Sequence, residues 1–154
     1  MVASMSRGKK AFLQYERELS EAIGRLSQLR EVLKASIDAD AESYNSVLKA
    51  YKAAKESPDG AQGIASALRQ ATAVPLAVAE MAVEVGDIAE KLKPITNPNM
   101  SSDLTTAIAL SKAAFTGAQA NVEINLGSLN SDASLDEAFV AETRARVAFL
   151  TERT

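Results

Sequence analysis

Residues 12–52 carry an apolar repeat of helical period, with one glycine and no proline, and this run constrains the fold more than any other feature. At about 100° of rotation per residue, the larger apolar side chains of the run fall within roughly 40° of one line along a helix. They are Leu26, Leu29, Leu33, Ile37, Tyr44, Val47 and Tyr51. At 1.5 Å per residue such a helix is about 60 Å long, which exceeds the diameter of a small domain. We therefore expect it to bend, to break, or to pack against a second subunit.

Helical patterns also account for the rest of the chain. Pro58 and Gly60 end the first run, and Pro75 is expected to kink or split the second. The remaining helices are predicted at about 61–93, 102–126 and 135–152. Ser134 and Glu137 have the spacing of a capping box at the start of the last one. No strand-like alternation interrupts them, so the sequence predicts an all-α helical bundle in a single domain, 1–154.

Composition excludes several classes of chemistry. With 0 Cys and 0 His, the chain can form no disulfide, no thiolate or imidazole metal site and no Ser-His-Asp triad. A net charge of -3 argues against a nucleic-acid partner. No apolar run approaches the roughly 20 residues that span a bilayer, and MVASMSRGKK lacks the pattern of a signal peptide. We expect a cytoplasmic protein with no metal and no membrane partner, whose chemistry uses carboxylates, amides, hydroxyls and lysines.

Asp40 is the first candidate functional residue. It lies inside the apolar stripe of the first helix, whereas Asp38 and Glu42 are each rotated about 160° away from it. A carboxylate on a packing face needs a hydrogen bond, a partner charge or a proton. Asp40 is therefore an acid at the rim of the stripe, the partner of an arginine on a neighbouring helix, or a functional group.

Polar side chains form two further groups. Asn121 and Asn125 are one helical turn apart, which predicts either a polar pocket or amides that bond a neighbouring backbone. The loop before the third helix carries Asn97 and Asn99 as turn formers, Ser101 or Ser102 as the helix N-cap and Asp103 in the first turn. These positions can equally belong to a binding site.

Four segments together resemble one family. They are MVASMSRGKKAF, IDADAESYNSVLKAYK, ATAVPLAVAEMA and NPNMSSDLTTAIALSKAAFTGAQANVEINL. In this order, over nearly the whole chain, they resemble the cyclodeaminase domain of formiminotransferase-cyclodeaminase and the stand-alone methenyltetrahydrofolate cyclohydrolases. The NPN-x-SSD and NV-x-IN blocks are specific when they occur together.

The resemblance implies an all-helical homodimer with a tetrahydrofolate site near the subunit interface. It implies that Asp40, the second aspartate of DADA, is the catalytic acid/base. The residues that would bind or orient the pterin are Asn97, Asn99, Ser102, Asp103, Asn121 and Asn125. Lys9 and Lys10 would meet the glutamate tail, although isolated lysines are ordinarily surface charge.

The implied reaction is one of two steps of folate one-carbon metabolism. One is hydrolysis of 5,10-methenyltetrahydrofolate to 10-formyltetrahydrofolate, and the other is cyclodeamination of 5-formiminotetrahydrofolate. Both need proton transfer, which one aspartate can supply, and neither needs a cofactor beyond the folate substrate. The lack of a fused formiminotransferase domain favours the cyclohydrolase.

One departure from the family leaves alternatives open. The family's glycine-rich PGGGS stretch and the helix after it are not found before MVASMSRGKK, so we expect a domain shortened at its N-terminus. The alternative is a non-catalytic helical homo-oligomer or interaction module derived from this family. A third interpretation is an unrelated bundle that binds partner helices.

Overall fold

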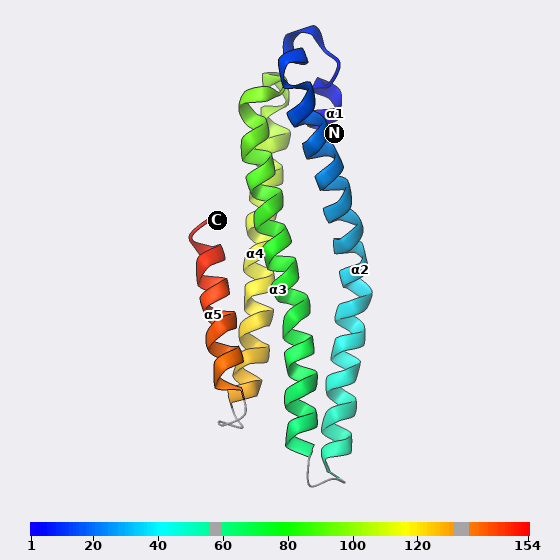
Figure 1. Cartoon of the computed structure of the whole chain (residues 1–154), viewed down its shortest axis with the longest axis vertical. Coiled ribbons are helices and arrows are strands. Elements are labelled where there is room, and N and C mark those ends of the chain that lie inside the picture. Colours follow the sequence, from blue (N-terminus) through cyan, green and yellow to red (C-terminus); the bar gives the residue numbers. More distant parts are fainter. Residues whose placement is uncertain (56–59, 131–135) are drawn as a thin grey trace.

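Three long helices form the body of the molecule in a computed structural model, which describes residues 1–55, 60–130 and 136–154. They are α2 (Glu16–Ala54), α3 (Gly60–Leu92) and α4 (Ser101–Asn130), and they run antiparallel to one another in chain order (Figure 1). The short α1 (Val2–Ser6) lies at the end where α2 begins, and α5 (Glu137–Thr151) runs beside α3 and α4. All the secondary structure of the described residues is helical, which confirms the predicted all-α class.

The helix boundaries differ in detail from those that the sequence predicts. The first run opens with a 3-10 segment, η1 (Lys10–Tyr15), before α2 begins. The second helix is not split, and α3 continues through Pro75. Ser101 and Ser102 are already part of α4, so the expected serine N-cap is wrong. The predicted capping box involves Ser134, which lies outside the described residues.

Two short 3-10 segments, η2 (Lys93–Ile95) and η3 (Pro98–Met100), turn the chain from α3 into α4. Between α1 and η1, Gly8 has φ 71°, a left-handed conformation that glycine adopts without strain. The N–H of Gly8 donates to Oε2 of Glu16 at 2.9 Å, and Arg7 pairs with the same carboxylate at 3.1 Å. These contacts hold α1 against the start of α2.

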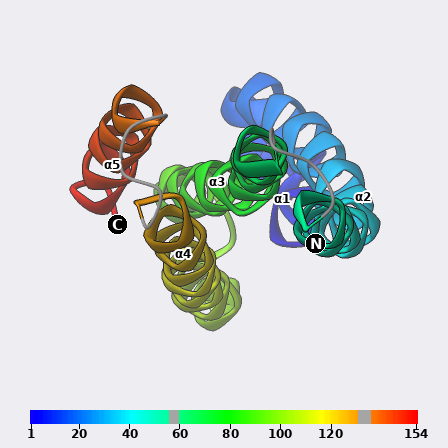
Figure 2. The same cartoon turned by 90° about the horizontal axis from the view of Figure 1, so that it is seen from below.

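The helix α3 occupies the centre of the bundle. Seen along the bundle axis, α2 lies on one side of α3, with α4 and α5 on the other (Figure 2). In consequence α3 and α4 contribute most of the buried side chains, whereas α2 buries only Leu19 and Leu29 of its 39 residues. Among the described residues, no helix has the length and apolar content that crossing a membrane requires.

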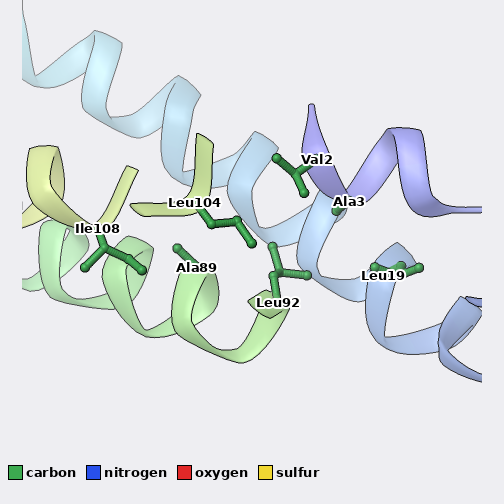
Figure 3. Packing of buried hydrophobic residues seen from close by; sticks show 7 residues of the cluster. All are labelled: Val2, Ala3, Leu19, Ala89, Leu92, Leu104 and Ile108. Carbon is green, nitrogen blue, oxygen red and sulfur yellow. The ribbon is translucent and has the colours of Figure 1, made fainter. Parts of the chain in front are cut away.

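The core consists of three apolar clusters spaced along α3 and α4. The cluster nearest the N-terminus joins α1, α2, α3 and α4 (Figure 3). Its buried members are Val2, Ala3, Leu19, Ala89, Leu92, Leu104 and Ile108. The other two clusters bring in α5 through Val140, Val147 and Leu150. Apolar contact therefore stabilises the α3/α4 pair over its full length.

Small residues let α3 and α4 approach closely, as their alanine-rich and glycine-containing sequences predict. Ala79 is fully buried. At Gly86, an added Cβ would lie 2.8 Å from Oγ of Ser111 on α4, closer than side chains normally approach. This close approach fixes the position of α4 relative to α3.

Ion pairs tie the outer helices to α3. Arg25 on α2 bonds both carboxylate oxygens of Glu84, at 2.5 and 2.7 Å, and these hydrogen bonds lower the pKa of Glu84 against the opposing effect of partial burial. On the other side, Arg146 of α5 pairs with Glu80 at 2.6 Å. Fixed partners of this kind orient α2 and α5 around the central helix.

Candidate functional site

A groove of about 360 Å³ lies where α2, α3 and α4 face one another. Three polar side chains line it, namely Ser36 and Asp40 from α2 and Asn121 from α4. The rest of the lining is apolar or small, and includes Pro75 of α3 and Gly117 of α4. We call this the Asp40 groove. It combines one carboxylate and one amide with an apolar floor, which is typical of sites that bind small organic molecules.

Asp40 is exposed at the wall of this groove. In the described part of the chain its carboxylate has neither an ion-pair nor a hydrogen-bond partner, so pairing with an arginine does not explain its position. Only its backbone carbonyl is engaged, accepting a hydrogen bond from Oγ of Ser43 at 2.8 Å. Both carboxylate oxygens are therefore available to a ligand.

The apolar stripe around Asp40 is itself only partly buried. Leu29 is buried, but Ile37 is 71% exposed, Tyr44 63% and Tyr51 44%. Within one chain the C-terminal half of the stripe is therefore not a packing face, because α3 covers only one side of α2. This is why Asp40 needs no internal partner.

The two asparagines of α4 have different surroundings. Asn121 is exposed, lines the Asp40 groove and has no hydrogen-bond partner among the described residues. Asn125 is half-buried, and its Nδ2 donates to the carbonyl oxygen of Ala71 on α3 at 3.1 Å. Of the two interpretations of this pair, a polar pocket fits Asn121 and a backbone-bonding amide fits Asn125.

The hydrogen bond of Asn125 explains why α3 is not split at Pro75. In an α-helix the carbonyl of residue 71 accepts from the N–H of residue 75, but proline has no N–H, so this carbonyl loses its partner. The amide of Asn125 supplies the missing donor from a neighbouring helix. The bond thus joins α3 to α4 directly beside the groove.

The asparagines before α4 shape the turn between α3 and α4. Oδ1 of Asn97 accepts from the N–H of Asn99 at 3.1 Å, and the N–H of Asn97 donates to Oγ of Ser6 at 3.1 Å. These contacts match the turn-forming interpretation of both residues. Asn97 provides the side-chain cap of this corner, at η3.

Asp103 lies in the first turn of α4, as predicted, and lines a second pocket of about 560 Å³ near the N-terminus. Asn121 follows it by 18 residues, about 27 Å along a helix. Ser102, next to Asp103, is exposed, and Lys9 and Lys10 are exposed at the start of η1. The structure therefore brings together Asp40 and Asn121, while the other predicted residues, apart from Asn125, gather at the opposite end of the bundle.

A third hollow, the central groove of about 410 Å³, connects these two regions. It shares Leu33 and Ile37 with the Asp40 groove, and Leu26 and Arg30 with the N-terminal pocket. Its cations are Arg30 and Lys34, which were not singled out from the sequence. The sequence feature that could have identified them is their position on the same helix as Asp40, ten and six residues before it.

Comparison with known proteins relates the chain to folate enzymes. The family model of formiminotransferase-cyclodeaminase matches residues 1–148. The chain is 31% identical to the formimidoyltransferase-cyclodeaminase of Sus scrofa, covering 99% of this chain and 28% of that protein. It is 32% identical to the methenyltetrahydrofolate cyclohydrolase of Methylorubrum extorquens, covering 89% of this chain and 68% of that protein. The chain thus spans just over a quarter of the length of the first relative and two thirds of the second.

A solved structure has the same fold. The formiminotetrahydrofolate cyclodeaminase of Thermotoga maritima superimposes with a TM-score of 0.81 and 29% sequence identity, covering 99% of this chain and 75% of that one. The family model and the fold agree over nearly all the residues. The chain belongs to the formiminotransferase-cyclodeaminase family.

Proposed function

We propose that the chain binds a tetrahydrofolate in the Asp40 groove and interconverts its one-carbon forms, with Asp40 as the acid/base. The main support is that Asp40 and Asn121, on different helices, line one groove, and that their polar groups have no partner among the residues that the structure describes. The names of the relatives supply the substrate class. The reaction is either that of a methenyltetrahydrofolate cyclohydrolase, a hydrolase, or that of a formiminotetrahydrofolate cyclodeaminase, a lyase.

Asp40 would act in both half-steps of the hydrolysis. The carbon that bridges N5 and N10 of 5,10-methenyltetrahydrofolate is electron-poor, and water attacks it while Asp40 takes the proton that water loses. The bond from that carbon to N5 then breaks as N5 receives a proton, and loss of the hydroxyl proton leaves 10-formyltetrahydrofolate. In the cyclodeamination N10 is the nucleophile and ammonia leaves, so the same carboxylate can serve. The proposal involves no cofactor beyond the folate.

Asn121 would hydrogen-bond the pterin, opposite Asp40 across the groove. Asn125 would support the groove wall through its bond to Ala71. None of the remaining family positions (Asn97, Asn99, Ser102, Asp103, Lys9 and Lys10) lines the Asp40 groove. We propose that Asn97, Asn99, Ser102 and Asp103 act from a second copy, in a homodimeric protein of the cytoplasm.

Partly filling the groove should weaken binding without disturbing the bundle. Gly117 lines the Asp40 groove and Gly127 does not, and a Cβ added at either would meet no atom of the described residues within 4 Å. We expect Gly117→Leu to raise KM for 5,10-methenyltetrahydrofolate about tenfold or more, because the leucine side chain would occupy part of the groove. A tenfold change corresponds to a loss of about 1.4 kcal/mol of binding free energy. Gly127→Leu on the same helix should change KM less than twofold.

The measurement is the loss of methenyltetrahydrofolate absorbance, corrected for its spontaneous hydrolysis in a blank without protein. Equal KM values for the two variants would exclude the Asp40 groove as the substrate site. Decay by the wild-type chain no faster than the blank, with either folate substrate, would instead favour the non-catalytic homo-oligomer.

The exposed half of the apolar stripe supports the homodimer. Ile37, Tyr44, Leu48 and Tyr51 lie exposed on α2, and contiguous apolar surface of this kind marks interaction sites. We expect a sedimentation mass about twice the 16.3 kDa of the chain. Tyr44→Glu should shift it toward the monomer, whereas Asn45→Glu, on another face of α2, should not. A wild-type monomer at high protein concentration would contradict the homodimer.

A further inference from the structure

The central groove next to Asp40 has a charge that the proposed reaction does not use. Arg30 and Lys34 line it from α2, beside apolar residues that include Leu33 and Ile37. Both cations share one carboxylate. Nε of Arg30 donates to Oε1 of Glu31 at 3.0 Å, and Nζ of Lys34 donates to Oε2 at 3.2 Å. The cluster of these three residues therefore carries a net charge of about +1 at the rim of an apolar groove.

The electrostatics of the cluster are consistent with a site for an anion. Two hydrogen bonds lower the pKa of Glu31, and the one from Arg30 has a larger effect than the one from Lys34. Glu31 thus remains ionised at neutral pH and occupies only part of the hydrogen-bonding capacity of the two cations, since a guanidinium has five N–H donors and an ammonium three. The N–H groups that remain can donate hydrogen bonds to a further carboxylate.

The spacing of these cations from Asp40 corresponds to the length of a folate. At 1.5 Å per residue, Lys34 and Arg30 lie about 9 and 15 Å from Asp40 along the axis of α2. In tetrahydrofolate about nine covalent bonds separate the reacting carbon from the α-carboxylate of glutamate, roughly 11 Å when extended at bond lengths of about 1.3 to 1.5 Å. The aminobenzoyl ring would lie between, over Leu33 and Ile37, which both grooves share.

We propose that Arg30 and Lys34 form a carboxylate subsite, which binds the glutamate moiety of the folate whose pterin occupies the Asp40 groove. This assignment rests on the proposed function. It replaces Lys9 and Lys10 as the partners of the glutamate, because those lysines line none of the three hollows between α2, α3 and α4. The subsite distinguishes glutamylated from unglutamylated pterins and leaves the chemistry at Asp40 unchanged.

The test compares the binding of two probes that differ only in glutamate, 5-formyltetrahydrofolate and 5-formyltetrahydropteroate, by titration calorimetry. We expect Arg30→Met and Lys34→Met each to weaken binding of 5-formyltetrahydrofolate about fivefold, the upper range for an exposed ion pair. Binding of 5-formyltetrahydropteroate should change less than twofold. Lys49→Met is the matched control, because Lys49 is exposed on the same helix and lines neither groove.

Glu31→Gln separates a subsite from a structural role. This change removes the carboxylate that competes for both cations, so it should tighten binding of 5-formyltetrahydrofolate about two- to fivefold and leave 5-formyltetrahydropteroate unaffected. A structural role of the cluster would alter both probes alike.

The remaining outcomes are distinct. Equal losses for both probes in Arg30→Met and Lys34→Met, or a loss of the glutamate preference in Lys9→Met with Lys10→Met instead, would overturn the subsite and leave the proposed function standing. Binding of neither probe by the wild-type protein would overturn both.

Discussion

Asp40→Asn is expected to lower the protein-dependent turnover of the folate substrate by about a hundred- to ten-thousandfold, the range that proton transfer by a positioned side chain contributes. Asparagine has nearly the same shape as aspartate, so the groove keeps its lining, but the amide cannot accept the proton that the nucleophile loses. The exposed position of Asp40 makes a change in stability small. The effect should therefore appear in kcat, with little change in KM.

Asp38→Asn provides the matched control. Asp38 is also exposed, on the same helix and only two residues away, but it does not line the groove. Its substitution alters net charge equally and should change turnover less than twofold. The assay is the absorbance decay of 5,10-methenyltetrahydrofolate, with ammonia release from 5-formiminotetrahydrofolate as the second readout. If Asp40→Asn retained activity within threefold of the wild type in both assays, another group would have to be the acid/base.

The second large effect concerns stability. Asn125→Ala should lower the free energy of unfolding by about 1–3 kcal/mol, the cost of leaving a buried polar group without a partner. The group in question is the carbonyl of Ala71, whose helical donor is missing because residue 75 is proline. Asn121→Ala, one turn earlier on α4, should change stability by less than about 0.5 kcal/mol, because this exposed amide bonds nothing in the described chain.

A double-mutant cycle with Pro75→Ala isolates the cause. Alanine at position 75 restores the N–H that bonds the carbonyl of Ala71, so Asn125→Ala should cost little in that background. We expect the two substitutions to be non-additive by about 1 kcal/mol or more, measured by urea denaturation of all four proteins. Additive effects would mean that Asn125 stabilises the bundle by packing alone.

Much of the fold can be predicted from the sequence, because helical period and breakers are local signals. The second helix, expected at about 61–93, is observed as Gly60–Leu92, and the long first run is observed as η1 followed by α2. Asp103 likewise lies in the first turn of its helix, as its position after the loop predicts. Within one helix, spacing alone determines which side chains share a face.

The candidate site was harder to predict, because it depends on which helices face one another. Asp40 and Asn121 are 81 residues apart in the sequence, and no local pattern shows that they line one groove. The same limit applies to Asn125, whose partner is a backbone carbonyl exposed by a proline 50 positions earlier. The exposure of the C-terminal half of α2 was missed for the same reason, since periodicity locates an apolar face but does not say what covers it.

The contact between Asn125 and the carbonyl of Ala71 also restricts the order in which this sequence can change. If Asn125 is lost first, the carbonyl is orphaned and the protein passes through a weakened intermediate. If Pro75 is replaced first, the helix recovers its own bond and Asn125 then becomes dispensable. Replacing Pro75 before Asn125 therefore avoids the destabilised intermediate, whereas the reverse order passes through it. Divergence at position 125 should follow, and not precede, the loss of proline at position 75.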